Sequence, residues 1–224
     1  MALDVRLSRS IAPGDEVDAA MRLDRASDVY LQRVSPIILH VAETEAERRD
    51  AFSLRYEAIV DQGWERPEAF PEGIEREELD DHATHVVGWL NGQAVANTRV
   101  ILPQPGRLLP VERDFGIRIE PFGSVAELDR TCTSRQTVVR ADTLLLALVS
   151  ACWQEVRRAG FSTITGRLSP GMLRLYRAVG IEHDILGPAQ VSWNEERYPV
   201  RFSATNATER FYDRLERLSR RPTR

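Results

Sequence analysis

The dipeptide Asn91-Gly92 constrains the fold of this chain more than any other feature of its sequence. It separates two apolar runs, residues 85–90 and 93–102, and Asn-Gly is the connection most typical of a two-residue β-hairpin. The strands on either side are therefore antiparallel, although helices and strands alternate later in the chain. This combination predicts a mixed α/β sheet.

Further local signals place helices around the hairpin. Thr44-Glu45-Ala46-Glu47 is a capping box that begins a helix ending at Gly63, and an apolar stripe predicts a long helix over 141–158. Ser169-Pro170 begins a shorter helix that ends at Gly180. The other expected elements are strands at 36–41, 124–132, 161–167, 182–186 and 190–204, loops at 64–78 and 103–121, and helices within 1–35 and 206–218. We therefore expect helices on both faces of the sheet.

These patterns divide the chain into three expected parts. Residues 1–35 form an N-terminal helical extension, 36–205 the main domain, and 206–224 a C-terminal helix with an arginine-rich tail. The extension either packs on the main domain or serves as a movable cover over an apolar substrate.

Composition excludes several classes of protein. All 30 basic residues are arginine, so lysine Schiff-base chemistry and a P-loop lysine are excluded. The net charge of −4 argues against general nucleic-acid binding, and two cysteines cannot make a disulfide scaffold. We see no signal peptide and no apolar run long enough to span a bilayer, so we expect a cytoplasmic protein.

Several sequence blocks resemble the GNAT acyltransferase superfamily, in the same order along residues 36–186. Leu-Tyr-Arg-Ala-Val-Gly-Ile at 175–181 resembles the helix-end signature of that superfamily. The blocks at 54–64, 77–85, 99–103 and 127–130 look like those of N-acyl amino acid synthases, exosortase-associated acyltransferases and, more distantly, acyl-homoserine-lactone synthases. The resemblance implies a GNAT-like fold with a splayed central sheet.

The resemblance also implies N-acyl transfer from a thioester, with Glu127 as the candidate base and Tyr176 as the candidate acid. Glu127 could instead form a structural salt bridge with Arg130 or Arg99, and Tyr176 could simply pack under the last strands. In a regular strand Glu127 and Arg130 point to opposite faces, so they meet only across a β-bulge. The resemblance implies such a bulge.

Six further residues are expected to bind the acceptor or order the loop over the thioester: Arg55, Trp64, Glu77, Asp80, Arg99 and Arg130. The arginines and acids could capture the carboxylate of the acceptor, or could form a structural network that ties this loop to the sheet. Trp64 either packs over the site or belongs to an ordinary core.

The thioester donor is expected near Arg135, Gln136 and Arg140. Val139 stands where the superfamily's phosphate loop has its first glycine, which makes a close approach to a pyrophosphate harder. This departure favours a donor on an acyl carrier protein over acyl-CoA. The arginine-rich tail could dock such an acidic carrier protein or be a solvated surface.

Two other chemistries are weaker alternatives. His82 and His85 lie three residues apart near Asp80, but no third histidine is close by, so we predict no metal site. Cys132 lies near the proposed site, yet no histidine partner is evident, so a buried apolar thiol is the better interpretation.

The overall prediction is an enzyme that transfers a fatty acyl group from acyl carrier protein or acyl-CoA to the amine of an amino acid or similar small molecule. No permanently bound cofactor is expected. The alternatives are an acyl-homoserine-lactone synthase that uses S-adenosylmethionine, a short-chain acetyltransferase, and a non-catalytic module that binds acyl carriers. The sequence leaves the acceptor, the chain length and the oligomeric state open.

Overall fold

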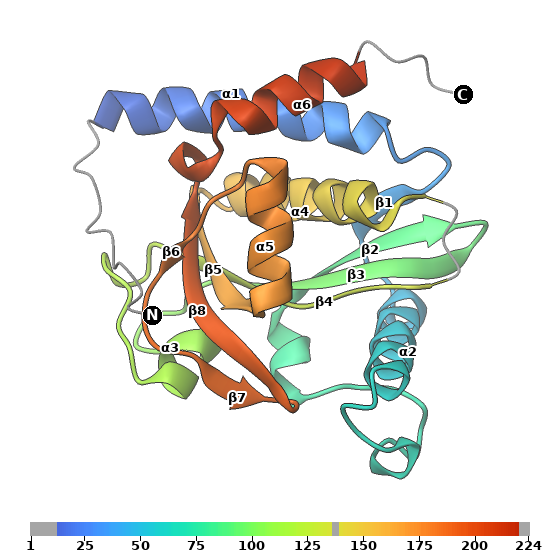
Figure 1. Ribbon diagram of the computed structural model, residues 1–224. Coiled ribbons are helices and arrows are strands. Elements are labelled where there is room, and N and C mark those ends of the chain that lie inside the picture. Colours follow the sequence, from blue (N-terminus) through green and yellow to red (C-terminus); the bar gives the residue numbers. More distant parts are fainter. Residues whose placement is uncertain (1–12, 136–138, 220–224) are drawn as a thin grey trace. The chain divides into compact units, whose positions relative to one another are not determined.

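The computed structural model describes residues 13–135 and 139–219 (Figure 1). These residues form two compact units. We call residues 27–102 and 128–160 the hairpin unit, and residues 13–26, 103–127 and 161–219 the C-terminal unit. No helix within the described residues is long and apolar enough to cross a bilayer.

The hairpin unit is built on strands in the spatial order β1-β2-β3-β4. Their bounds are β1 Ile38–Val41, β2 Thr84–Leu90, β3 Gln93–Ile101 and β4 Ala126–Thr133, the last of which begins in the C-terminal unit. β2 and β3 pair antiparallel, with His85 opposite Arg99. Asn91 and Gly92 join them as the expected two-residue hairpin, with φ values of 51° and 79° that suit a type I′ turn.

Two helices cover opposite faces of these strands (Figure 1). They are α2 (Glu45–Asp61) and α4 (Ala141–Arg158). The predicted capping box begins α2: Glu47 N–H donates to Thr44 Oγ1 at 3.2 Å, and Thr44 N–H donates to the Glu47 carboxylate at 3.0 Å. With a helix on each face, most of β3 is buried, so its charged and polar residues need partners inside the protein.

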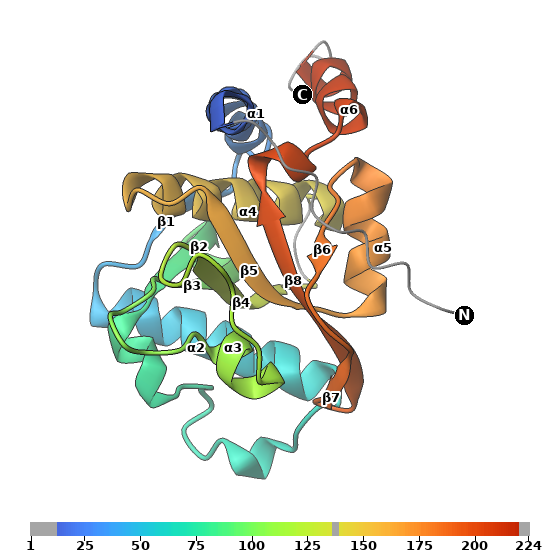
Figure 2. The same cartoon turned by 90° about the vertical axis from the view of Figure 1, so that its left-hand side faces the viewer.

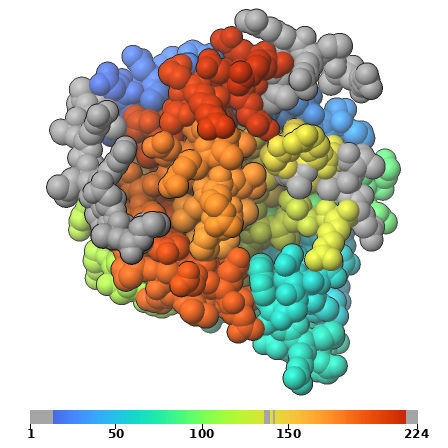
Figure 3. Space-filling model, in the orientation of Figure 1, coloured from blue at the N-terminus to red at the C-terminus, as the bar shows by residue number. Residues whose placement is uncertain are grey.

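The C-terminal unit contains a second group of antiparallel strands. They are β5 (Thr163–Leu168), β6 (Asp184–Ile185), β7 (Gln190–Ser192) and β8 (Glu195–Ser203), and β8 pairs with each of the others. α5 (Pro170–Val179) packs on β5 and β8, as Figure 2 shows, and the outer face of α5 lies on the molecular surface in orange in Figure 3. Ser169 caps α5 as predicted, and Gly180 ends it.

The remaining helices are α1 (Pro13–Gln32), α3 (Pro110–Phe115) and α6 (Glu209–Ser219), with short 3₁₀ turns η1 (Pro67–Ala69), η2 (Glu78–His82) and η3 (Ala204–Asn206). Arg22 of α1 forms an ion pair with Glu209 of α6 and lies 3.6 Å from the ring centre of Tyr212. Within the C-terminal unit, α1 is thus tied to α6.

Three expectations from the sequence were wrong in detail. The loop expected over 103–121 contains α3, and the loop expected over 64–78 contains η1 and leads into η2. The single strand expected over 190–204 is two strands, β7 and β8, because Trp193 and Asn194 both have a φ of 56° and form a tight turn. His82 ends η2, and β2 begins two residues later.

Gly180 should tolerate no side chain. Its φ is +91°, and a Cβ there would meet the backbone nitrogen of Phe211 and lie 2.9 Å from Phe211 Cα. We expect Gly180→Ala to lower the free energy of unfolding by about 3 kcal/mol, through left-handed strain and overpacking together. Thermal or denaturant unfolding measures this loss.

Gly160→Ala is the matched control, because Gly160 has a similar φ of +88° but open space around its Cβ position. It should cost only the backbone strain, about 1 kcal/mol. Equal losses for the two variants would contradict the close approach of Phe211.

Candidate active site

Three arginines and three acids form a closed ring of ion pairs in the hairpin unit. We call these residues the ion-pair ring; in order around it they are Arg55, Glu75, Arg130, Glu77, Arg99 and Asp80. Positive and negative groups alternate at every step. The segment that carries Glu75, Glu77 and Asp80 is thereby tied to α2, β3 and β4.

The buried side of the ring has the strongest geometry. Arg55 donates to both oxygens of Asp80, at 2.7 and 3.1 Å, and also to Glu75. Arg99 donates to the same Asp80 carboxylate at 2.9 Å, and it donates two hydrogen bonds of 2.7 and 2.6 Å to Asp129. Such forked contacts are the strongest kind of ion pair that arginine makes.

The ring reaches solvent at its other side. Arg130 donates to Glu75 at 3.0 Å and to Glu77 at 3.4 Å, and Glu77 lies 2.6 Å from the guanidinium of Arg99. The side chain of Glu77 is 43% exposed and that of Arg130 is 22% exposed, whereas those of Arg55 and Arg99 are at most 2% exposed. Only the Glu77–Arg130 side of the ring is therefore accessible to a small molecule.

An unusual backbone conformation at Arg130 completes the ring. Its φ is +52° within β4, a left-handed value that non-glycine residues rarely adopt. Successive side chains of a regular strand point to opposite faces, but here both Asp129 and Arg130 contact ring residues. Asn97 supports this conformation by donating from Nδ2 to the Arg130 carbonyl at 3.2 Å.

The charges of the ring favour its ionised state. Burial alone would raise the pKa of Asp80, but the hydrogen bonds and charge of Arg55, with the charge of Arg99, lower this pKa to about 2. Burial works against the charge of Arg99, yet Asp129, Asp80 and Glu77 raise its pKa above the ordinary value. Asp80 and Arg99 therefore stay charged across the physiological pH range.

His85 lies beside the ring as a neutral group. Its side chain is 1% exposed, and burial lowers its pKa despite the nearby Asp80. Its Nε2 lies 3.2 Å from the Asp80 carbonyl oxygen, and its ring meets Phe52 edge to face. No cluster of three or more His, Cys, Asp or Glu side chains in the described part of the chain is arranged to hold a metal ion.

Glu127 has different partners from those expected. Its fully buried carboxylate accepts a 2.9 Å hydrogen bond from the backbone N–H of Val111 in α3 and lies 3.6 Å from the guanidinium of Arg167. The expected alternative of a salt bridge with Arg130 or Arg99 is thus replaced by one with Arg167. All three partners of this arrangement belong to the C-terminal unit.

The structure adds a histidine beside Tyr176. The phenol ring of Tyr176 is 7% exposed, and its centre lies 5.0 Å from that of His183, which also packs against Phe202 at 5.7 Å. Burial lowers the pKa of His183 to about 4, so the imidazole is neutral at pH 7. Tyr176 therefore has an uncharged aromatic neighbour in the C-terminal unit.

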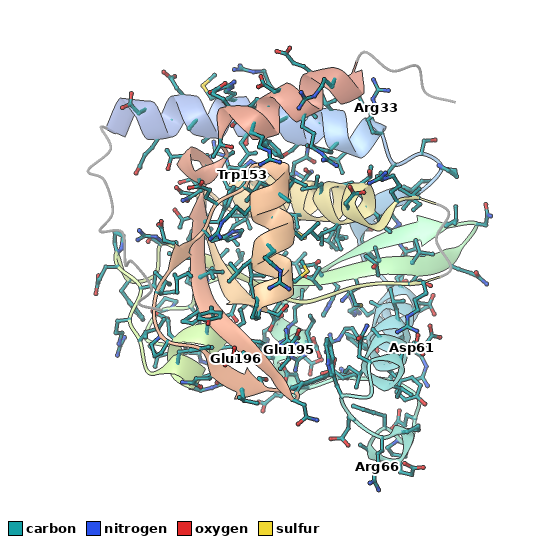
Figure 4. All side chains as sticks on the ribbon, viewed as in Figure 1. Arg33, Asp61, Arg66, Trp153, Glu195 and Glu196 are labelled. Atoms are coloured by element: carbon teal, nitrogen blue, oxygen red, sulfur yellow. The ribbon has the colours of Figure 1, made fainter. Side chains whose placement is uncertain are left out.

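Two of the three expected donor-binding residues, Arg135 and Arg140, are among the described residues. Gln136 is outside the described residues. Arg135 lies 3.7 Å from Asp61, which Figure 4 labels at the end of α2, and Arg140 pairs with Asp142 at 3.1 Å. Both arginines are largely exposed, so a role in donor binding stays a prediction.

Trp64 and Cys132 are two further residues that the sequence placed at or near the site. Trp64 follows α2 and is half-buried, and its backbone N–H donates to the Ile59 carbonyl at 3.1 Å. Its packing over the site stays a prediction. Burial raises the pKa of Cys132 to about 12, which suits a thiol and not a nucleophilic thiolate.

Sequence reasoning missed Glu75, Asp129 and His183. Asp129 lies inside the Glu-x-x-Arg block, and Glu75 lies just before the acidic block that begins at Glu77. A search for carboxylates to match each buried arginine would have pointed to both. Nothing in the sequence around His183 signals its contact with Tyr176.

No protein family matches the sequence of this chain, and no curated protein matches it either. Solved structures do share its fold. The acyl-homoserine lactone synthase LasI matches with a TM-score of 0.65 and 13% identity, covering 79% of this chain and 95% of LasI. FeeM, an N-acyl amino acid synthase from uncultured soil microbes, matches with a TM-score of 0.62 and 12% identity, covering 79% of this chain and 97% of FeeM.

A third match is BjaI, a CoA-dependent acyl-homoserine lactone synthase, with a TM-score of 0.63 and 16% identity over 84% of this chain and 92% of BjaI. The mixed α/β, GNAT-like fold expected from the sequence is thereby confirmed.

Asp80 should be the least replaceable acid of the ring. We expect Asp80→Asn to lower the free energy of unfolding at pH 7 by about 3 kcal/mol, because two buried guanidinium groups lose a shared carboxylate. Because the pKa of Asp80 falls from its ordinary 3.8 to about 2 on folding, this contribution is present above about pH 4 and lost towards pH 2. Denaturant unfolding across that range should show the gap to wild type closing.

Asp81→Asn is the control for Asp80, since the ion-pair partner of Asp81 among the described residues is the exposed Arg76. Its cost should stay below about 1 kcal/mol. Similar losses for the two variants would show that the ring contributes no more than a surface pair.

His183 should make the protein sensitive to mild acid. The unfolded chain binds a proton at this residue below about pH 6.5, while the folded protein resists protonation down to about pH 4, so stability falls between these values. We expect His183→Phe, which keeps a ring against Tyr176 and Phe202, to reduce that fall by about 2 kcal/mol.

Unfolding free energies measured between pH 7 and pH 4 test this effect. His82→Gln is the control, because His82 is exposed. An unchanged pH dependence in His183→Phe would contradict burial of a neutral imidazole.

Proposed function

We propose that this protein is an N-acyltransferase that moves a fatty acyl group from an acyl-carrier-protein or acyl-CoA thioester to the amine of a small molecule. The observation that carries the proposal is the buried Glu127 carboxylate, fixed by Val111 and Arg167, in a fold shared with LasI and FeeM. A fold hosts many chemistries, so the assignment depends on testing this carboxylate.

The reaction needs two proton transfers. The amine nitrogen attacks the thioester carbonyl carbon, a C–N bond forms, and the C–S bond breaks to release a thiolate. An acceptor that arrives as an ammonium ion gives up two protons in total, and the thiolate takes up one. We assign Glu127 to accept a proton from the amine, directly or through one water molecule.

Tyr176 is assigned to protonate the leaving sulfur. A phenol donates a hydrogen bond readily while remaining neutral at pH 7, and its aromatic neighbour His183 is neutral as well. The hydroxyl would transfer its proton to the sulfur as the C–S bond breaks.

The ion-pair ring is assigned to order residues 64–83 and to present the Glu77–Arg130 side to the acceptor. The contacts of Arg55 and Arg99 with buried carboxylates support a structural role for these two side chains. The more exposed Glu77 and Arg130 are the ring members that can touch a ligand.

Lactone synthesis is the second candidate. LasI and BjaI are acyl-homoserine lactone synthases, and their TM-scores of 0.65 and 0.63 are as high as that of FeeM at 0.62. BjaI has been solved with S-adenosylmethionine and isopentyl-CoA. Incubation of this protein with S-adenosylmethionine and acyl thioesters, followed by detection of methylthioadenosine and an acylated lactone, would favour this candidate.

Replacement of Glu127 tests the main proposal. Purified protein is incubated with acyl-CoA and acyl-carrier-protein thioesters of increasing chain length and a panel of amines, and amides are detected by mass spectrometry. We expect Glu127→Gln to lower kcat about 100- to 1000-fold, because the amide cannot accept the proton although it still accepts from Val111 N–H. Wild-type rates in this variant would remove Glu127 from catalysis.

Glu112→Gln is the matched control. Glu112 is also a buried glutamate that accepts from backbone N–H groups, those of Leu109 and Ile119 at 2.9 Å each. We expect this variant to lose about 1 kcal/mol of stability while the folded protein keeps its turnover. Binding of a thioester without amide formation from any amine would show that the chain is a binding module instead.

A further inference from the structure

The charge balance of the ring bears on the identity of the acceptor. Its three guanidinium groups face three ring carboxylates and also Asp129, which adds a fourth. Each of the three arginines already contacts at least two carboxylates. With His85 neutral, the assembly has a net charge of −1 and no guanidinium that lacks a carboxylate partner.

The segment that supplies the ring acids is strongly acidic as a whole. Residues 64–82 contain eight acidic side chains and two arginines. The two arginines are Arg66 and Arg76, and Arg76 is paired with Asp81. An acceptor near Glu77 would therefore meet a negative electrostatic potential, which attracts ammonium groups and repels carboxylates.

A buried side-chain oxygen beside the ring also contributes negative potential. Asn97 lies two residues before Arg99 on the same face of β3, and its side chain is fully buried. Its Nδ2 donates to the Arg130 carbonyl, while no hydrogen-bond donor among the described residues reaches Oδ1. The partial negative charge of this oxygen adds to the negative potential beside Arg130.

We infer that the acceptor of the proposed acyl transfer is a cationic amine without a carboxylate, so that amines are favoured over the corresponding amino acids. This inference rests on the proposed function. It departs from the sequence-based alternative in which the three arginines capture an acceptor carboxylate, because those arginines already contact the protein's own acids. Discrimination would arise from repulsion of the wrong acceptor as much as from attraction of the right one.

Acceptors that differ only in the carboxylate test the inference. Rates are compared for tyrosine, tyrosine methyl ester and tyramine, and for leucine and 3-methylbutylamine, with one thioester donor. We expect kcat/KM for the amines and the ester to exceed that for the amino acid by about tenfold or more. An amino acid that reacts as well as its amine, in whichever series gives product, would overturn the inference.

Glu77→Gln should reduce this preference. The substitution removes one negative charge from the exposed side of the ring and makes the assembly neutral. We expect KM for tyramine to rise about fivefold, with a smaller change in kcat, and the amine-to-amino-acid ratio to fall by a similar factor. Glu78→Gln is the control, because Glu78 is exposed and outside the ring, and it should keep the wild-type preference. An unchanged preference in Glu77→Gln would count against the ring as the acceptor site.

Direct binding separates this inference from the proposed function. Calorimetric titrations of the wild type with tyramine and with 3-(4-hydroxyphenyl)propionate compare an amine and a carboxylate of similar shape. We expect tighter binding of tyramine, and equal or tighter binding of the carboxylate would contradict the inference whether or not turnover is seen. Absence of amide from every amine and donor would overturn the proposed N-acyl transfer itself.

Discussion

The left-handed backbone of Arg130 is the constraint on which the arrangement of the hairpin unit depends. A regular strand would direct Asp129 and Arg130 to opposite faces, and the network could then hold only one of them. With both side chains on one face, Arg99 obtains its forked partner and Glu75 is joined to Glu77. Because partly satisfied buried charges are costly, the strain at one residue is offset by the closure of the whole network.

Local signals predicted the framework of this fold. The capping box at Thr44 and the hairpin at Asn91-Gly92 are confirmed, because each is decided by a few neighbouring residues with one favourable geometry. The sequence did not predict α3, because its formation is not decided by neighbouring residues. A six-residue helix has little intrinsic stability, and this one is supported by tertiary contacts, including the hydrogen bond from Val111 to Glu127.

The sequence identified the arginines of the network better than their partners. Arg55 and Arg99 could be recognised as charges on apolar faces, which must be paired if buried. Their contacts, however, join residues far apart in the chain, such as Arg130 and Glu75, which are separated by 55 positions. No short-range pattern specifies such a pair. The sequence left open whether these arginines capture an acceptor carboxylate or tie the loop to the sheet, and the structure shows that the protein's own acids contact them.

The exclusive use of arginine has a chemical consequence for a protein proposed to handle activated acyl groups. A lysine side chain is a primary amine, and in its deprotonated form it attacks thioesters as an acceptor does. A guanidinium remains protonated and does not compete in this way. A ring built from arginine therefore pairs with its buried acids without offering a nucleophile to a thioester, and no side chain of the whole sequence can be acylated as an amine.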